Sequence, residues 1–143
     1  YLEGQTVDVV RDDLALDQKT VSSGAITTDI VPTTYVEVGI PYTPQIVTLP
    51  IETRLPNGNV QGFLKRITEV NLILNLTQNI KVDTEEVSFR NLEALSLGTG
   101  IEFFTGIKTV QPLSGFTEES TLTITQTKPL FFTLLGIEYK VSV

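Results

Sequence analysis

Apolar and polar residues alternate along most of this chain, most clearly between residues 64 and 76. Aliphatic side chains occupy every second position at Val70, Leu72, Leu74 and Leu76. A period of two predicts a β-strand that turns these side chains toward one face. At about 3.3 Å per residue such a strand would be about 40 Å long, so we expect a bend or bulge somewhere along it.

Shorter stretches of the same kind predict strands over much of the remaining chain. They lie at residues 6–10, 34–39, 101–104, 107–110, 121–126 and 130–143. β-Branched and aromatic residues are frequent in these stretches, as is typical of strands. Residues 14–21 predict a short hairpin around Asp17 and Gln18. After a turn, we expect residues 25–30 to return as a further strand.

Proline and the Asn-Gly pair indicate where strands should end. The stretch from Gln45 to Ile51 is apolar but is bounded by Pro44 and carries Pro50. Proline cannot donate a hydrogen bond to a sheet, so this stretch predicts an edge strand or an extended crossing segment. Asn-Gly is the strongest short turn signal, and it predicts a turn within residues 55–59.

The number and spacing of these segments define the expected fold class. We find no amphipathic helical pattern of ten or more residues, no internal repeat and no long linker. Short strands separated by Gly, Pro and Asn turns predict an all-β fold with little helix, an antiparallel β-sandwich or barrel-like domain. A chain of 143 residues fits a single β-rich domain over residues 1–143.

Composition excludes several classes of function. Ten Lys and Arg against seventeen Asp and Glu give a net charge of −7, which opposes binding to a phosphate backbone. The chain has no Cys and no His, so thiolate chemistry, His-based acid–base catalysis and His-ligated zinc are excluded. The absence of Met leads us to expect a piece of a longer protein. No apolar run approaches the ~18 residues of a membrane-spanning helix, so we expect no membrane insertion by this segment.

Carboxylates are the only plentiful catalytic material. They cluster in sequence at Asp12, Asp13, Asp17, Glu85 and Glu86. Such groups could serve a glycosidase or hold calcium, but no calcium-loop frame is present. We therefore favour solvated turn residues, and we expect no catalytic residue, no metal and no cofactor.

Two kinds of side chain are candidates for a subunit interface. Lys65-Arg66 is the only adjacent basic pair, and alternation predicts one residue on each face, with Arg66 on the face of Val70 and Leu72. We favour an ion pair at a domain or subunit boundary over a nucleic-acid contact, because the net charge opposes the latter. The pairs Phe103-Phe104 and Phe131-Phe132 place one aromatic ring on each face of a strand. One ring could serve the core and the other a subunit contact.

Six segments in order carry a resemblance to a known family. They are YLEGQTVDVV (1–10), TVSSGAI (20–26), VEVGIPY (36–42), TLPIE (48–52), QGFLKRITEV (61–70) and LTITQTKPLFFTLLG (122–136). Their succession resembles the carboxy-terminal part of the tail nozzle proteins, also called tail tubular protein B or phage stabilisation proteins, of short-tailed bacteriophages. The family often has a second proline where this chain reads PLFFT (129–133), and residues 81–100 have no counterpart pattern.

The resemblance implies a structural role in a virion, assembled from protein made in the bacterial host cytoplasm. Family members form a homohexameric ring at the distal end of the phage tail, contact adaptor and fibre proteins, and enclose the channel through which DNA leaves without specific binding. They are not enzymes. The family's Lys-Arg element falls on Lys65 and Arg66. An acidic wall that repels a polyanion suits such a conduit.

Two other classes of function remain open from the residues alone. A β-sandwich carbohydrate-binding module, on a virion or cell surface, would use Tyr35, Tyr42 or Tyr139 as stacking platforms with acidic hydrogen-bond acceptors. A carboxylate hydrolase would need two carboxyl groups about 5–9 Å apart in a cleft.

Overall fold

The computed structural model of this chain describes residues 2–29, 31–32, 34–52, 54–55, 58–59, 62–89, 100–112 and 115–143. Within these ranges the chain forms strands and no helix. The strands are β1 (Thr6–Arg11), β2 (Leu14–Thr20), β3 (Val36–Gly39), β4 (Gln45–Val47), β5 (Arg54–Leu55), β6 (Gly58–Asn59), β7 (Arg66–Thr77), β8 (Lys81–Val82), β9 (Glu85–Glu86), β10 (Phe104–Val110), β11 (Thr123–Thr125) and β12 (Leu134–Ser142). The prediction of an all-β fold is confirmed.

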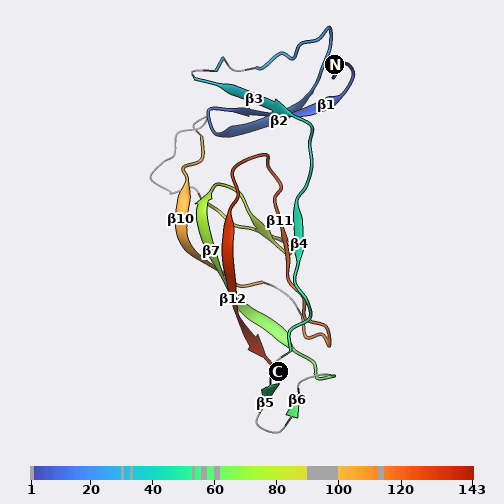
Figure 1. The fold of residues 1–143 in the computed structure, drawn as a ribbon, viewed down its shortest axis with the longest axis vertical. Helices are drawn as coiled ribbons and strands as arrows, with labels where there is room; N and C mark the ends of the chain where they lie inside the picture. Colours follow the sequence, from blue (N-terminus) through green and yellow to red (C-terminus); the bar gives the residue numbers. More distant parts are fainter. Residues whose placement is uncertain are drawn as a thin grey trace.

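Two antiparallel sheets enclose the main core along the body of the molecule (Figure 1). One sheet has the strand order β10-β7-β12 and the other β4-β11-β8-β9. The core between them is aliphatic and is made of Ile51, Ile67, Val70, Leu72, Leu74, Ile80, Val82, Val87, Val110, Leu122 and Ile124. These side chains come from both sheets and from the segments next to their strands, so the arrangement is a sandwich, with its sheets not closed into a barrel.

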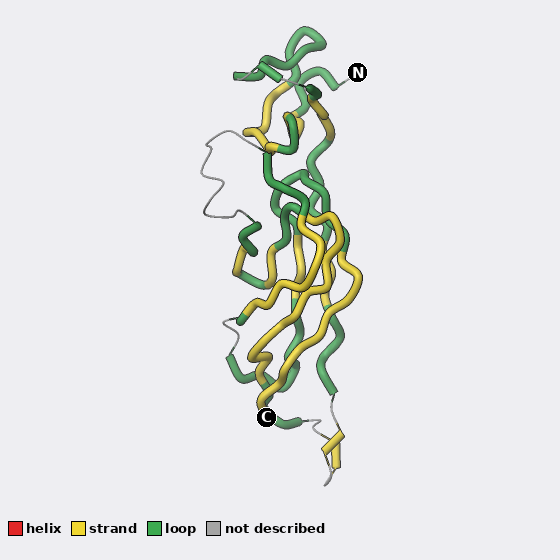
Figure 2. Tube along the Cα trace, turned by 90° about the vertical axis from the view of Figure 1, so that its left-hand side faces the viewer, coloured by secondary structure: helices red, strands yellow, loops and turns green. Residues whose placement is uncertain are grey.

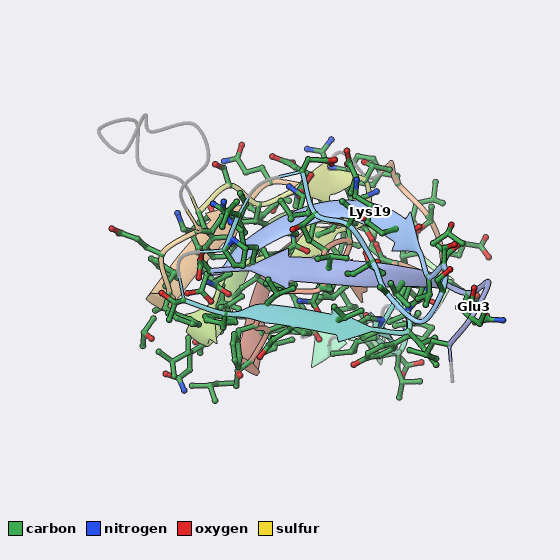
Figure 3. All side chains as sticks on the ribbon, turned by 90° about the horizontal axis from the view of Figure 1, so that it is seen from above. Glu3 and Lys19 are labelled. Atoms are coloured by element: carbon green, nitrogen blue, oxygen red, sulfur yellow. The ribbon has the colours of Figure 1, made fainter. Side chains whose placement is uncertain are left out.

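A third sheet, of order β2-β1-β3, lies across one end of this sandwich (Figures 1 and 3). Its strands run across the long axis, whereas β7, β10 and β12 run along it. It has its own buried cluster of Val7, Val9 and Val21, packed by partly buried neighbours. The described residues thus form two apolar clusters, and the expectation of a single domain over 1–143 stays a prediction.

An extended segment from β3 to residue 52 runs beside the sandwich toward the small hairpin β5–β6, near the C-terminus (Figures 1 and 2). Within it, β4 pairs only with β11, at the edge of its sheet. The prediction of an edge strand in a crossing segment is therefore confirmed. Leu55 pairs with Gly58, in agreement with the turn expected within residues 55–59, and residues 56 and 57 lie outside the described residues.

The long strand β7 contains two irregularities, which confirms the expected bulge. In its register against β12, Glu69 pairs with Lys140 and Ile67 pairs with Val141, so Thr68 has no opposite residue in β12. Near the other end Leu76 has φ 47°, is half exposed, and is followed by a buried Thr77. Each extra residue exchanges the two faces of the strand.

These bulges overturn two details of the alternation argument. Arg66 was expected on the face of Val70 and Leu72, but Lys65 is buried and Arg66 is exposed. The reason is the unpaired Thr68, which puts Ile67 on the buried face in place of Arg66. Leu76 leaves the apolar face because β7 has an extra residue between Leu74 and Thr77 relative to β10.

The N-terminal hairpin turns at a different place from the one predicted. Its turn is Asp12-Asp13, both with positive φ, and β2 continues as one strand through Asp17 and Gln18. The register shift between Val7 and Val9 places Asp17 and Gln18 opposite the single residue Asp8, which makes a bulge. The Gln18 amide donates to the Asp8 carboxylate at 2.8 Å. A polar pair that looked like a turn is therefore a bulge.

Two further strand predictions are corrected. Residues 25–30 were expected to form a strand, but the described part of this stretch, residues 25–29, contains only the isolated bridge between Ser22 and Ala25. The strand expected at 107–110 is part of a longer strand, β10, which begins at Phe104 and continues through Gly106 with φ 147°. Residues 101–103 of the other expected strand form no strand.

Candidate functional site: interaction surfaces

The two Phe-Phe pairs place one ring inward and one outward, as predicted, but of these four residues only Phe104 lies in a strand. Phe104 and Phe132 are partly buried against the main core. Phe103 and Phe131 are 45% and 55% exposed. These two outward rings contact each other edge to face, with centroids 5.4 Å apart and planes at 62°. A pair of exposed aromatic rings in this geometry forms an apolar surface patch.

Gln78 positions both sides of this aromatic pair. Its side chain is 1% exposed, its amide nitrogen donates to the Ile101 carbonyl at 2.5 Å, and its amide oxygen accepts from the Phe131 N–H at 3.3 Å. The backbone N–H of Gln78 also donates to the Phe131 carbonyl at 2.9 Å. This buried amide therefore links the two backbone segments that carry Phe103 and Phe131.

The neighbours of Gln78 hold the loop that leads into β12. The Thr77 hydroxyl bonds the backbone of Thr133. The Asn79 carboxamide oxygen accepts from the N–H of Thr127 and of Lys128, each at 3.0 Å. Its nitrogen donates to Glu86 Oε1 at 3.0 Å. This buried polar tripeptide, Thr77 to Asn79, was not among the predicted site residues, although its position at the end of the long apolar strand was a usable signal.

Lys65 and Arg66 occupy different environments at the start of β7. Lys65 is 2% exposed, and its backbone forms a bridge with Thr117. Arg66 is exposed, and its guanidinium carbon lies 5.7 Å from the centroid of the half-exposed Phe116 ring. Among the salt bridges of the described residues, none involves Lys65 or Arg66. The ion pair at a boundary therefore stays a prediction, and Arg66 is the residue exposed enough to make it.

A cleft lies where the end sheet meets the loop before β12. It consists of two adjoining cavities of about 170 and 320 Å³ that share Val10, Glu37, Pro129 and Leu130. Tyr35 lines the smaller cavity and Tyr42, 80% exposed, lines the larger. Three carboxylates, Asp8, Asp13 and Glu37, border the cleft together with the cation of Lys128. The third predicted stacking residue, Tyr139, lines a separate cavity beside Leu49.

Tyr35 is fixed at this cleft by the acidic turn of the end sheet. Its hydroxyl donates to Asp13 Oδ1 at 2.7 Å, and its backbone N–H donates to Asp12 Oδ1 at 3.0 Å. The hydrogen bond to Asp13 raises the pKa of the Tyr35 hydroxyl, because it favours the protonated form and a phenolate would face a carboxylate. The ring is thus held in one orientation at the cleft wall.

Two of the other clustered carboxylates, Asp12 and Glu86, accept hydrogen bonds within the protein. Asp12 accepts the N–H groups of Thr34 and Tyr35, and Glu86 accepts from Asn79. Within the described ranges, no group of three or more acidic side chains is arranged to hold a metal ion. In the same ranges no helix is long and apolar enough to cross a bilayer.

Comparisons with known proteins add no assignment. The sequence matches no protein-family model, and a search of curated proteins finds no significant match.

Proposed function

We propose that this chain is a structural component of a virion, part of the tail nozzle of a short-tailed bacteriophage. In this proposal identical subunits form a hexameric ring around the channel for DNA ejection, and the ring contacts adaptor and fibre proteins. The proposal has two parts, a surface built for assembly and an assignment to the nozzle. The second part rests on the six-segment resemblance described above.

The observation that supports assembly is the outward pair Phe103 and Phe131. Both rings are about half exposed, and the buried Gln78 bonds the backbone of Phe131 and of Ile101, two residues before Phe103. Aromatic side chains are enriched at the cores of protein interfaces, where they bury a large area at little entropic cost. Two exposed aromatic rings already in contact are therefore a better anchor for a subunit interface than scattered apolar side chains would be.

The charge of the chain suits a DNA conduit. Residues 1–37 carry seven acidic side chains against two basic ones, so the end of the molecule built from β1, β2 and β3 is strongly negative. A negative surface repels the phosphate backbone and does not retain DNA that passes it. At the turn of that sheet, Asp12 and Asp13 accept hydrogen bonds from Tyr35.

The test uses the complete gene product that contains this chain. Electron microscopy of the purified protein is expected to show rings with six-fold symmetry. Arg66→Glu should reduce ring formation while the melting temperature of the subunit changes little, because Arg66 is exposed. The matched control is Lys19→Glu, which breaks only the exposed pair of Lys19 with Asp29.

Three results would contradict this proposal. Particles without rotational symmetry would contradict the proposed hexameric ring. Equal losses of assembly and of subunit stability in Arg66→Glu would remove its interface role. Equal effects of the two charge reversals on assembly would show a general charge effect.

The acidic cleft supports a second candidate, a carbohydrate-binding module. Tyr35 and Tyr42, both predicted as stacking platforms, line adjoining cavities that Asp8 and Glu37 border as hydrogen-bond acceptors. A glycan array probed with the chain should then give hits that Tyr42→Ala abolishes. Phe63→Ala, which also removes a half-exposed ring, should leave those hits unchanged. An array without hits would dispose of this candidate.

A further inference from the structure

The edge strand β4 and the residues around it carry no charge, although the chain as a whole is acidic. Residues 40–51 contain none of the ten basic and seventeen acidic residues of the chain. The other outer strands of the three larger described sheets each carry charge, as β9 does at Glu85–Glu86 and β2 does at Asp17 and Lys19. Charged side chains are a common means of preventing unwanted pairing at an edge, and β4 lacks them.

The free side of β4 presents backbone groups in a regular array. On its paired side, the Thr48 N–H donates to the Leu122 carbonyl at 2.9 Å, and the Pro44 carbonyl accepts from Gln126 at 3.4 Å. Even-numbered positions therefore face β11. In an antiparallel ladder the positions between them face the other way, so the peptide groups of Gln45 and Val47 point away from β11.

Apolar side chains accompany this free edge. The large hydrophobic residues of the segment that are more than 40% exposed are Ile40, Tyr42, Ile46, Val47 and Leu49. Leu49 is 85% exposed. Prolines at 44 and 50 bound the stretch, so a pairing strand has only a short window available. The edge combines unpaired peptide groups with exposed apolar side chains, which are the two requirements for strand addition.

We infer that an edge strand of a second copy of this chain pairs with β4 and continues its sheet across a subunit boundary. The inference rests on the proposed assembly of identical subunits. Two copies that each carry a net charge of −7 repel one another over most of their surfaces. They approach with least repulsion where one of the two contributes no charge, and β4 with its flanking residues is such a place. A strongly basic partner would gain no attraction at this edge, which is why an identical acidic subunit fits it better.

The experiment combines sedimentation with hydrogen exchange on the purified chain. The sedimentation coefficient should rise with protein concentration, and the amides of Gln45 and Val47 should gain protection over the same range. Val47→Pro removes only a donor that points away from β11, and Val47→Lys places a charge at the edge. Each should raise the dissociation constant by at least about tenfold.

The matched control is Leu135→Lys on β12. Leu135 is 65% exposed, so this variant also replaces an exposed aliphatic side chain with a charge but leaves β4 intact. We expect its dissociation constant to stay within about twofold of the unmodified chain. Far-UV circular dichroism and urea midpoints establish that all three variants are folded.

Several outcomes would overturn the inference. One is a chain that sediments as a monomer at every concentration, and another is a Val47 amide whose exchange does not slow as copies associate. Association that is unaffected by Val47→Pro would also exclude the pairing. If the complete protein still forms six-fold rings with Val47→Pro, the pairing of β4 with a second copy is excluded and the proposed function is unaffected. Absence of rings in the unmodified protein would contradict the proposed function itself.

Discussion

Replacing Asn79 with alanine should release the loop that precedes β12. The side chain of Asn79 is 3% exposed and makes four hydrogen bonds. Its oxygen accepts from the N–H and hydroxyl of Thr127 and from the N–H of Lys128, and its nitrogen donates to Glu86. Asn79→Ala removes all four bonds at once.

The free energy of unfolding lost in Asn79→Ala depends on how exposed the hydrogen-bond partners of Asn79 are. Each intramolecular hydrogen bond contributes about 0.5–1.5 kcal/mol net. Thr127, Lys128 and Glu86 are exposed, so water can replace part of what they lose. We expect the free energy of unfolding to fall by about 2–4 kcal/mol, a large share of the roughly 5–15 kcal/mol of a typical domain.

Urea unfolding measures this loss directly. The chain has no Trp, so far-UV circular dichroism is the appropriate signal. With a urea m-value of about 2 kcal/mol/M, the midpoint should fall by about 1–2 M while the m-value is unchanged.

Asn71→Ala is the matched control. The Asn71 side chain accepts one exposed hydrogen bond, from the Thr109 hydroxyl at 2.7 Å, and its loss should be less than about 1 kcal/mol. Equal losses in the two variants, or a loss below about 1 kcal/mol in Asn79→Ala, would refute the conclusion that Asn79 holds this loop.

Three further perturbations test other parts of the structure. Gly100→Ala should cost about 1–3 kcal/mol in urea unfolding, because a methyl group there overlaps the Asp12 carbonyl; an unchanged midpoint would contradict this packing. The backbone N–H groups of Ser23 and Gly24 donate to the Glu3 carboxylate and lower its pKa from 4.5. These hydrogen bonds therefore stabilise the fold fully above pH 4.5, and the stabilisation is lost as pH falls through the lowered pKa. Thermal melting between about pH 5 and about pH 2 should show this loss, and Glu3→Gln should flatten the profile; parallel profiles would exclude the effect. Asp13→Asn should lower the pKa of the Tyr35 hydroxyl, measured by tyrosinate absorbance, and an unchanged titration would exclude the hydrogen bond as the cause.

Local rules predicted much of the fold and part of the candidate site. The period of two marked β7 and its apolar face, because successive side chains of any strand point to opposite sides. The same rule placed one ring of each Phe-Phe pair on each side of its chain. Proline at positions 44 and 50 marked β4 as an edge, because a residue without an N–H cannot serve in the middle of a sheet.

The candidate site could be predicted only in its parts. The two Phe-Phe pairs are far apart in sequence, and the contact between Phe103 and Phe131 depends on Gln78, which bonds the segments that carry them. The convergence of Tyr35 and Tyr42 on one cleft depends on where the end sheet sits against the loop before β12. Neither relation has a signature in the residues themselves.

The amino-acid sequence by itself determined that this protein is built from strands, since strand periodicity and turn chemistry are properties of neighbouring residues. Tertiary structure alone decided which way the side chains near Thr68 point. A bulge exists only when a partner strand pairs with the residues on either side of the extra one, as β12 does with Ile67 and Glu69. For that reason Arg66 faces solvent and Lys65 is buried, the reverse of what counting alternate positions along the chain predicts.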